Sequence, residues 1–570
     1  MWIREAQPTE AEARAVTDLV LRSKAHWGYD AAFLARCRQE LTVTAADVRP
    51  RRIVVAEDDG GGLLAVASLE GEPPHGALGL LFVAPEEIGR GLGRTLYAHV
   101  LEDARALGFT ALTIDADPHA VGFYRALGAR PLPDAGGALP RLAVDLAPRP
   151  AWARAWADGR RAVHLGNVAE FQAQFAGAGR RPRPAAPPAR FPAADHYACL
   201  AAFASPHPVA LALPARVPAG WIDLVARQLR WARVEVYDRL DEAALLAQGG
   251  FGERWRDRPF VAWGHTDVAA RLAGLRLPAD ALRHESKAES HALFRRLAPD
   301  HPGIRVPDRW PAATRRAAAR LIAARARSGA RTVVKTAHGA GGSGTRIATG
   351  RVRALSLPPG PLLVEEYVTG DGTHPTYDGL VDARGTVHDV GVASMDMGGP
   401  DGTAYRGATV GPGAVPDRIA RPALRFGRAV GRALAADGYR GWFDVDFVTG
   451  DDGLLAPVET NLRLTGPSVA FMIKLRLDET RGGDHLVRCV DRVDLGARLP
   501  DGELMAFLTG LTERCAGVDA VLIPTIPSAA YDPVPYVGVA VAARTLPRLD
   551  AAASLTQTSC AALSGVFTRA

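Results

Sequence analysis

Apolar and polar positions alternate in short blocks along the first 146 residues. Four mostly apolar blocks predict strands, and one block with apolar residues at helical spacing, 94–108, predicts an amphipathic helix. The predicted strands are 51–58, 63–71, 77–85 and 111–117. Helices interleaved with strands are typical of an α/β unit.

The same pattern returns after a break in composition. Residues 177–195 are rich in Pro, Arg and Ala and lack periodicity, which predicts a linker. Beyond it, apolar blocks separated by helical stretches predict a second α/β unit, with strands in 208–215, 232–238 and 259–264. The block 162–175 is compatible with either neighbouring unit.

Strands predominate further on, and the tail mixes a helix at 503–515 with further strands. A chain of 570 residues also predicts several domains at roughly 100–200 residues each. We therefore expect a multidomain protein of the α/β and α+β classes. The expected parts are residues 1–146, a linker at 147–195, and then 196–305, 306–485 and 486–570.

Composition narrows the class of protein. Hydrophobic residues make up 48% and charged residues 23%, which is typical of a soluble globular protein and excludes wholesale disorder. No apolar run approaches the roughly 20 residues of a membrane helix, and the charged N-terminus has no apolar segment of a secretory signal. We expect a cytoplasmic protein without a membrane partner. The five cysteines are scattered, which predicts buried free thiols instead of a disulfide framework or zinc site.

The charge does not indicate nucleic-acid binding. The net charge of +6 is diffuse, and its densest cluster, Arg180 to Arg183, lies in the predicted linker. Only four of the 68 basic residues are lysines, so a retained lysine indicates a need for a compact cation. The four are Lys24, Lys287, Lys335 and Lys474.

Closely spaced glycines follow the predicted strand 77–85 and precede the helix 94–108. Backbone N–H groups of such a loop approach an anion at the positive end of the helix dipole. The alternative for the glycines alone is a tight strand-to-helix turn. About 30 residues later, Phe123-Tyr124 precedes Leu127-Gly128-Ala129.

Together these elements resemble the GNAT N-acetyltransferase family over nearly all of residues 1–146. The resemblance implies a mixed sheet that binds acetyl-CoA, with the backbone amides of Phe82 and Val83 on the pantetheine arm. It implies that Tyr124 donates a proton to the departing CoA thiolate, although a tyrosine there also serves as packing. The implied pyrophosphate loop is Gly89, Arg90, Gly91, Leu92, Gly93, Arg94 and Thr95.

This unit departs from the family pattern at two positions. Ile88 stands where Gln or Arg is frequent, and Asp117 stands where Asn is usual. The sequence does not place the general base, because Glu70 and His75 lie near the right strand only as lone residues that are expected at the surface. Trp27 and Tyr29 are candidates for the acceptor pocket.

A second constellation begins with two of the four lysines. Lys335 ends a predicted strand before the glycine-rich loop 339–344, and Lys287 begins a predicted helix. The lysine precedes the glycines, so the loop is not a Walker loop. Such a loop folds over phosphates while the lysine supplies positive charge.

Acidic residues follow at a spacing that suits a metal. Asp446 lies 13 residues before Glu459, and Asn461 and Arg463 follow two and four residues after that. If both segments are antiparallel strands joined by the turn at 450–453, the oxygens of the first three converge on one face. Such oxygens suit Mg²⁺ beside phosphates. The neighbouring carboxylates Asp444, Asp451 and Asp452 are expected to be solvated.

This combination resembles the ATP-grasp carboxylate–amine ligases over about residues 200–480. The resemblance implies an α/β domain that precedes the ATP-grasp α+β nucleotide-binding fold, and a small C-terminal domain. It implies that Asp446, Glu459 and Asn461 bind Mg²⁺ and that Arg463 steadies the transferred phosphoryl group. The implied nucleotide contacts are Lys287, Lys335, Gly341, Gly342, Ser343, Gly344, the adenine hinge Glu365, Glu366, Tyr367 and Val368, and Asp371 at the ribose.

The resemblance also implies a reaction. A carboxylate attacks the γ-phosphate of ATP, and an amine captures the acyl phosphate to give an amide, ADP and phosphate. The Asn461-Leu462-Arg463 variant is most similar to pheganomycin-type peptide ligases. Tyr405 and Arg406 are candidates for holding a substrate carboxylate.

Two catalytic domains predict a bifunctional enzyme that ligates and N-acetylates small carboxylates and amines such as amino acids or peptides. One alternative makes the first unit a non-catalytic CoA-binding module, with Ile88 as its sign. Another has the ligase load an amino acid onto a carrier protein. The order of steps and a homodimer are left open.

Overall fold

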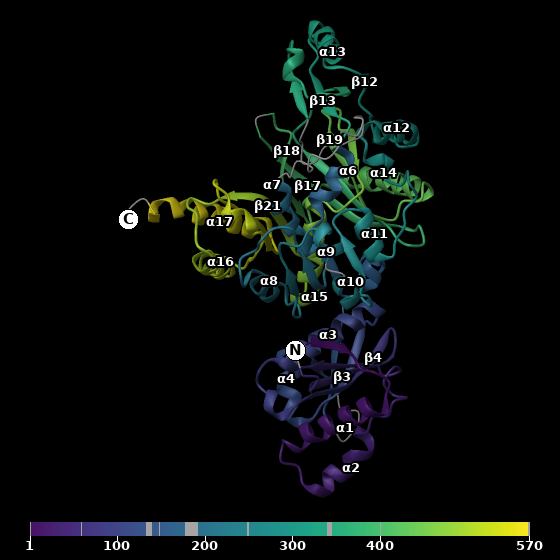
Figure 1. Cartoon of the computed structure of the whole chain (residues 1–570), viewed down its shortest axis with the longest axis vertical. Helices are drawn as coiled ribbons and strands as arrows, with labels where there is room; N and C mark the ends of the chain where they lie inside the picture. The colour runs from purple at the N-terminus through teal and green to yellow at the C-terminus, as the bar shows by residue number, and fades with distance from the viewer. Residues whose placement is uncertain are drawn as a thin grey trace. The chain divides into compact units, whose positions relative to one another are not determined.

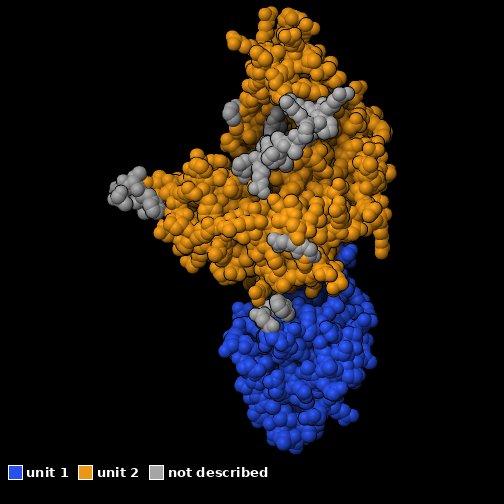
Figure 2. Space-filling view, viewed as in Figure 1, with its two compact units in different colours: residues 1–154, 158–160 blue, residues 155–157, 161–570 orange. Residues whose placement is uncertain are grey.

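The computed structural model describes residues 2–58, 60–132, 139–146, 149–176, 192–247, 250–338, 345–399 and 401–567. The chain forms two compact units, coloured separately in Figure 2. Unit 1 comprises residues 1–154 and 158–160, and unit 2 comprises residues 155–157 and 161–570. The short helix α5 (Ala151–Ala155) spans the boundary between them in the sequence.

Unit 1 is a mixed sheet with helices on both faces. Its strand order is β1-β2-β3-β4-β5-β7-β6, and β4 and β5 form the parallel pair. The strands are β1 (Trp2–Glu5), β2 (Ile53–Glu57), β3 (Leu63–Glu72), β4 (His75–Val83), β5 (Ala111–Asp115), β6 (Arg130–Pro131) and β7 (Arg141–Asp145). The helices are α1 (Glu10–Ala25), α2 (Ala31–Leu41), α3 (Leu92–Leu107) and α4 (Val121–Ala126). The predicted α/β unit with a mixed sheet is confirmed.

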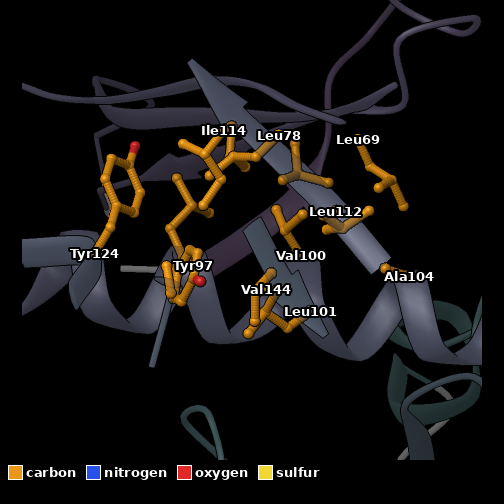
Figure 3. Close-up of a cluster of buried hydrophobic side chains, with 14 of the residues drawn as sticks. Leu69, Leu78, Tyr97, Val100, Leu101, Ala104, Leu112, Ile114, Tyr124 and Val144 are labelled. Carbon is orange, nitrogen blue, oxygen red and sulfur yellow. The ribbon is translucent and has the colours of Figure 1, made fainter. Parts of the chain in front are cut away.

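Alternation along the strands explains the two buried faces. On β2, Val54 and Ala56 pack with Leu96 and Val100 of α3, in the cluster that Figure 3 shows. Val55, between them, packs with α1 in a separate cluster. Because successive side chains of a strand point to opposite faces, one strand supplies both cores.

The pairing of β4 and β5 leaves part of the sheet open. The parallel register joins them only over His75–Leu78 and Ala111–Ile114, whereas β4 continues to Val83 paired with β3 alone. Phe82 and Val83 therefore lie on a stretch of strand without a β5 neighbour, just before α3 begins.

Unit 2 begins with a parallel sheet in the order β10-β9-β8-β11. Its strands are β8 (Ala162–Leu165), β9 (Pro208–Ala212), β10 (Glu235–Tyr237) and β11 (Phe260–Ala262). The block 162–175, which the sequence left open, contributes β8 and most of α6 (Val168–Ala176), so it belongs to this sheet. The other helices are α7 (Pro192–Tyr197), α8 (Trp221–Leu229), α9 (Glu242–Ala247), α10 (Gly250–Arg254) and α11 (Asp267–Ala273).

Two antiparallel sheets follow. The smaller has the order β12-β15-β13-β14 and packs against α13 (Arg315–Arg327) (Figure 1). Its strands are β12 (Arg309–Ala312), β13 (Thr332–Thr336), β14 (Arg346–Ala348) and β15 (Leu362–Glu366).

The larger sheet has eight strands in the order β20-β19-β16-β17-β18-β21-β23-β22. They are β16 (His374–Val381), β17 (Val387–Gly398), β18 (Ala404–Val410), β19 (Gly441–Thr449), β20 (Leu455–Asn461), β21 (Leu486–Asp494), β22 (Val521–Ile526) and β23 (Tyr536–Ala543). Its helices are α12 (Lys287–Leu297), α14 (Asp417–Ala436), α15 (Gly466–Arg481), α16 (Asp501–Ala516) and α17 (Leu546–Phe567). Residues 486–570, expected as a small domain, thus extend this sheet through the pairing of β18 with β21.

The multidomain α/β and α+β class is confirmed. All five cysteines are free, and four are buried as predicted, with Cys37 partly exposed. Within the described residues, no helix combines the length and the apolar character needed to cross a bilayer. Of the linker predicted at 147–195, residues 147–148 and 177–191 lie outside the described residues, whereas the described part contains β8 and α6 and so is not a linker throughout.

Candidate active sites

The loop before α3 in unit 1 is built for an anion. Gly89 and Gly91 have φ of +86° and +87°, the left-handed region that glycine adopts without strain. No side chain caps α3, and its first turn carries no acidic residue. The first backbone N–H groups of α3 are thus left to a ligand, at the positive end of the helix dipole.

Tyr124 lies on α4 and packs against α3, the helix that follows this loop. Its ring packs edge-on against Tyr97 of α3, with centroids 5.7 Å apart, and its side chain is 6% exposed (Figure 3). Burial raises the pKa of Tyr124 well above its usual value, so the hydroxyl keeps its proton at neutral pH. A protonated, positioned phenol is what a proton donor requires.

The carboxylate of Asp117, in the loop after β5, is held by Lys24 of α1 and by Tyr29, which follows that helix. Lys24 Nζ lies 2.5 Å from Asp117 Oδ2, and Tyr29 Oη donates to Asp117 Oδ1 at 2.9 Å. Trp27 stacks on His119 with centroids 5.2 Å apart. Burial would raise the pKa of Asp117, but its bonds from Lys24, the His119 amide and Tyr29 lower it. Trp27 and Tyr29 therefore both contact the His119 ring, and Tyr29 also holds the Asp117 carboxylate.

Glu70 and His75, the two residues considered for the general base of unit 1, differ in their exposure to solvent. Glu70 is partly buried and accepts hydrogen bonds from Arg51 Nε at 2.8 Å and Ser68 Oγ at 2.7 Å. Glu70 is therefore engaged with its neighbours instead of solvated. His75 is exposed, as predicted.

A cleft of about 1410 Å³ in unit 2 brings together most of the residues singled out for the ligase. The predicted residues that line it are Lys287, Lys335, Glu365, Tyr367, Val368, Asp446, Glu459, Asn461 and Arg463. The glycine-loop residues Gly341, Gly342, Ser343 and Gly344 lie outside the described residues.

The hairpin of β19 and β20 has the predicted antiparallel pairing. Asp446 lies directly opposite Glu459, and Asn461 lies opposite Asp444. Since side chains directly opposite each other share a face, the two predicted metal carboxylates meet in the cleft.

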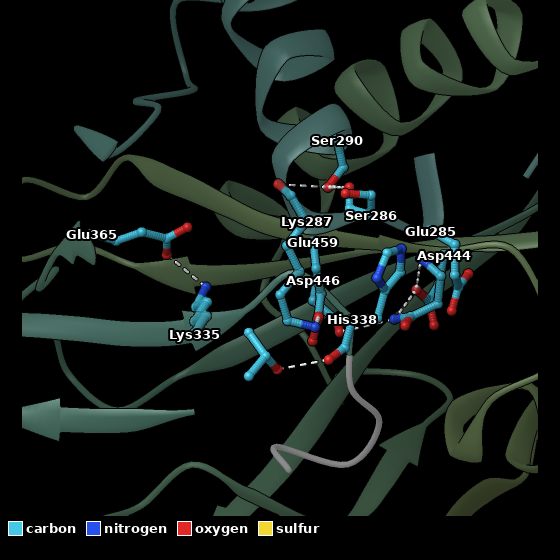
Figure 4. Close-up of polar contacts among 12 residues, drawn as sticks. Glu285, Ser286, Lys287, Ser290, Lys335, His338, Glu365, Asp444, Asp446 and Glu459 are labelled. Carbon is cyan, nitrogen blue, oxygen red and sulfur yellow. Dashed lines mark hydrogen bonds and ion pairs between the residues drawn. The ribbon is translucent and has the colours of Figure 1, made fainter. Parts of the chain in front are cut away.

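The two lysines meet the same cleft from different elements. The Lys287 backbone N–H donates to Ala337 O at 2.9 Å, which joins the start of α12 to the chain just after β13. Lys335 Nζ pairs with Glu365 Oε2 at 2.7 Å, and Lys287 pairs with Glu459 (Figure 4). These acids hold the ammonium groups in place.

The two opposed carboxylates differ in charge state. Burial would raise the pKa of Glu459, but the charges of Lys287 and Lys335 lower it. Burial, with the nearby charge of Glu459, raises the pKa of Asp446 to about 7. Glu459 is thus ionised at neutral pH, whereas Asp446 needs a further cation to be fully ionised.

A divalent cation fits this pair. Asp446 Oδ1 is buried without a hydrogen-bond partner among the described residues. Those residues contain no group of three His, Cys, Asp or Glu side chains placed to hold a metal. Mg²⁺ is commonly held by only one or two carboxylates together with phosphates, so a pair of acids with an unpaired oxygen suits it.

Asn461 and Arg463 are linked to each other. Arg463 Nη2 donates to Asn461 Oδ1 at 2.7 Å, while Asn461 Nδ2 donates to Asp444 Oδ1 at 2.7 Å. Arg463 also pairs with Glu285, which precedes α12. Burial lowers the pKa of Arg463 to about 10, which leaves the guanidinium charged at neutral pH.

One expectation about the acidic hairpin is wrong. Asp444 is not solvated: it is 1% exposed and lines the cleft, whereas Asp451 and Asp452 are exposed as predicted. Burial, with the charges of Asp446 and Asp378, raises the pKa of Asp444 well above its usual value. Asp444 lies inside strand β19, whereas Asp451 and Asp452 lie in the turn. The acidic composition of the segment does not distinguish a strand position from a turn position.

Two predicted nucleotide contacts, Glu366 of the hinge and Asp371, lie outside the cleft lining. The carboxylate oxygens of Glu366 each accept from Arg305 Nη1 at 3.1 Å, on the side of β15 away from Glu365. Asp371 is exposed and accepts from the Thr373 N–H at 2.9 Å, although Gly370 and Gly372 line the cleft.

Sequence reasoning missed a group of cleft residues that carry no motif. They are Phe171 and Phe175 of α6, Tyr197 of α7, Trp263, Glu285 and Asp491 of β21. The only signal in the sequence was the amphipathic block 162–175, which had no assigned unit.

Residues 19–129 match the acetyltransferase (GNAT) family. The match confirms the predicted acetyltransferase domain of unit 1, and the family is one of enzymes, as predicted. No curated protein matches the chain.

Three solved structures illustrate what the chain is similar to. One is N5-carboxyaminoimidazole synthase from Aspergillus clavatus in complex with ADP and 5-aminoimidazole ribonucleotide. It is 14% identical to this chain, the match covers 63% of this chain and 99% of that chain, and the TM-score is 0.42. Biotin carboxylase from Campylobacter jejuni is 13% identical, with 69% and 89% covered, at a TM-score of 0.42. PaiA N-acetyltransferase from Thermoplasma acidophilum, with coenzyme A, is 14% identical, with 25% and 98% covered, at a TM-score of 0.23. Similarity at this level does not define the activity of unit 2.

Proposed function

We propose that the chain is a bifunctional cytoplasmic enzyme. Unit 2 joins a carboxylate to an amine at the expense of ATP, and unit 1 transfers an acetyl group from acetyl-CoA to an amine. One observation carries the ligase proposal: the pairs Lys287–Glu459 and Lys335–Glu365 and the unpaired oxygen of Asp446 face one cleft.

The basic groups of the cleft suit a nucleoside triphosphate. Lys287 and Lys335 neutralise phosphate charge, and Tyr367 and Val368 form an aromatic and apolar wall for the base. Asp446 and Glu459 would hold Mg²⁺, with Asn461 beside them, and the metal would neutralise phosphate charge when bound.

Arg463 stands next to these acids. A buried guanidinium held by Glu285 and Asn461 loses little freedom when it contacts a phosphoryl group. We assign it to the charge that develops as the substrate carboxylate attacks the γ-phosphate, which gives an acyl phosphate and ADP. An amine then displaces phosphate from the acyl carbon, and an amide results.

The proposal for unit 1 rests on the open N-terminus of α3 and on Tyr124. The loop from Gly89 to Thr95 would bind the pyrophosphate of CoA, and Phe82 and Val83, on the stretch of β4 that has no β5 neighbour, would contact the pantetheine arm. Tyr124 would protonate the thiolate that leaves when an amine attacks the thioester.

The substrates belong to the class of small carboxylates and amines, such as amino acids or peptides. The kinship to pheganomycin-type ligases stays a prediction from the Asn461-Leu462-Arg463 segment.

A mass-spectrometric screen tests both activities at once. Purified protein is incubated with Mg·ATP, acetyl-CoA and pooled amino acids, and ADP and new masses are followed. A condensed and acetylated product is expected. ADP formation without any acetylated species would leave unit 1 as a CoA-binding module. A product seen only when a carrier protein is added would favour the loading reaction.

Glu459→Gln is the decisive variant for unit 2. It removes the negative charge that faces Lys287 and the metal site, so we expect ligation to fall by at least about 100-fold while acetyl transfer is unchanged. Asp451→Asn, in the exposed turn of the same hairpin, is the matched control and should leave both rates unchanged. Loss of both activities in a folded Glu459→Gln protein would refute separate sites.

A further inference from the structure

The cleft of unit 2 has a second set of polar residues, on segments that are distant in sequence from the lysine pairs. Asp491 of β21, Tyr197 of α7 and Tyr405 of β18 all line the cleft, although they come from three distant segments. Tyr197 is hydrogen-bonded to Asp491. The pairing of β18 with β21 brings Tyr405 to the same region.

The carboxylate of Asp491 has no cation beside it among the described residues. The charge of its neighbour Arg492 is directed elsewhere: Arg492 Nε pairs with Asp494 Oδ1 at 2.7 Å, and its guanidinium lies 4.4 Å from the Tyr536 ring centroid. Arg463, the other cation near Tyr197, pairs with Glu285. Asp491 is therefore a half-buried acid whose hydrogen-bond partner Tyr197 is neutral.

The surroundings of Asp491 suit a cation. The Tyr405 hydroxyl oxygen is buried without a hydrogen-bond partner among the described residues. Aromatic rings surround the space, because Trp263 packs edge-on against Tyr197 at 5.5 Å and Tyr536 also lines the cleft. A carboxylate, unfilled hydroxyl lone pairs and aromatic faces are the groups that bind an ammonium ion.

Charged side chains of both signs line the cleft. Its cations are Lys287, Lys335, Arg463 and Arg492, and its acids include Asp396, Asp401 and Asp491. A triphosphate and a substrate carboxylate favour the first set, and a protonated amine favours the second.

We propose that Asp491, together with the hydroxyl groups of Tyr197 and Tyr405, binds the ammonium group of the amine substrate of unit 2. The inference rests on the proposed ligase function and specifies its second substrate as a cationic primary amine, such as the α-amino group of an amino acid. Asp491 acts here as a binding residue for the second substrate in the same cleft.

Burial raises the pKa of Asp491 to about 7, which agrees with an acid that lacks its counter-ion. An ammonium ion bound beside the carboxylate would lower the pKa of Asp491 again, so binding and ionisation would support each other.

The test compares a cationic amine with a neutral one. Hydroxylamine is mostly uncharged at neutral pH and traps an acyl phosphate as a hydroxamate. Wild type and Asp491→Asn are incubated with Mg·ATP and pooled amino acids, with and without hydroxylamine, and hydroxamate and condensed products are measured.

In Asp491→Asn we expect condensation to fall by at least about tenfold at low amine concentration, because the loss of one partner of a charged pair lowers binding affinity by more than about tenfold. Hydroxamate formation should stay within about twofold, because Asn occupies the same space and the first step does not need the amine site.

Asp494→Asn is the matched control, because Asp494 ends the same strand, is exposed and pairs only with Arg492 among the contacts described. It should leave both products unchanged. Equal condensation in wild type and Asp491→Asn, or an equal loss of both products in a protein with unchanged thermal unfolding, would overturn the inference. Absence of both products in the wild type would instead refute the ligase function itself, and the inference would fall with it.

Discussion

Lys24 and Asp117 form a buried ion pair in unit 1, and Tyr29 completes it. The folded state holds the pKa of Asp117 below its usual value, so this carboxylate stabilises the fold at pH values above the normal Asp range. The stabilisation disappears as the pH falls through the lowered pKa. A pair of this kind couples α1 to the loop after β5.

Asp117→Asn should therefore destabilise unit 1 in a pH-dependent way. Asn keeps the shape but leaves Lys24 without a counter-ion, and we expect a loss of about 1–3 kcal/mol at pH 7. The difference from wild type should shrink as the pH falls below about 4, where the carboxyl group is protonated first in the unfolded chain, and should vanish below the lowered pKa of the folded state. Urea unfolding at pH 7 and at acidic pH measures it. A difference that is constant over this range would show that the charge of Asp117 is not what matters.

Tyr124 and Tyr97 offer a matched pair of hydroxyl groups. Tyr124→Phe keeps the ring packing and removes only the acid, so acetyl transfer should slow by about 100-fold, the range found for a positioned general acid. The Tyr97 hydroxyl is buried without a partner among the described residues, so Tyr97→Phe should leave the rate unchanged. Thiol release from acetyl-CoA reports both rates. Equal rates for Tyr124→Phe and wild type would remove Tyr124 from the reaction.

At the level of elements, α14 packs closely on the large sheet through glycine. A β-carbon at Gly427 would lie 2.2 Å from Tyr377 Cδ1 of β16. Tyr377 is fully buried and donates to Asp389 Oδ1 at 2.9 Å, so its ring is held in place. The small residue thus sets how near the helix approaches β16, the strand that pairs with β19 of the β19–β20 hairpin.

Gly427→Ala should destabilise unit 2. Overpacking costs about 1–3 kcal/mol, against a gain of about 1 kcal/mol from the better helix propensity of alanine. Gly502→Ala in α16 is the control, because a β-carbon there meets nothing within 4 Å. The control should gain up to about 1 kcal/mol, so the two substitutions are expected to differ in sign. Denaturant unfolding measures both, and a stabilised Gly427→Ala protein would contradict the close packing.

At the level of the whole molecule, unit 1 extends beyond the boundary that the sequence predicted at residue 146. Arg149 Nη1 donates to the Gly159 carbonyl at 3.0 Å, and a β-carbon at Gly159 would lie 3.3 Å from Ala106 of α3. The segment after β7 is therefore part of the packing of unit 1.

A fragment of residues 1–160 should fold by itself and transfer acetyl groups at the rate of the full chain. A fragment of residues 1–146 lacks the contacts of Arg149 and Gly159 and should unfold several degrees lower, since about 1 kcal/mol shifts the melting temperature of such a domain by several degrees. Thermal unfolding and acetyl-CoA turnover compare the two. Identical melting temperatures would place the boundary at residue 146 after all.

Local physics explains which features were predictable from the chain. A short turn between two strands sets their register, so the spacing of Asp446 and Glu459 already implied that they face each other. Glycines between a strand and an amphipathic segment likewise implied the loop before α3. In both cases the residues that meet are close in sequence, and the period of the element alone orients them.

The amine end of the ligase cleft depends on contacts that no local pattern encodes. Tyr197, Tyr405 and Asp491 meet because β18 pairs with β21 and α7 lies against them, and strand order is set by packing across the whole unit. The burial of Asp444 has the same origin, since exposure depends on what covers a residue. Sequence alone therefore specified the residues that act within one hairpin or loop, while the tertiary fold decided which distant side chains share the cleft.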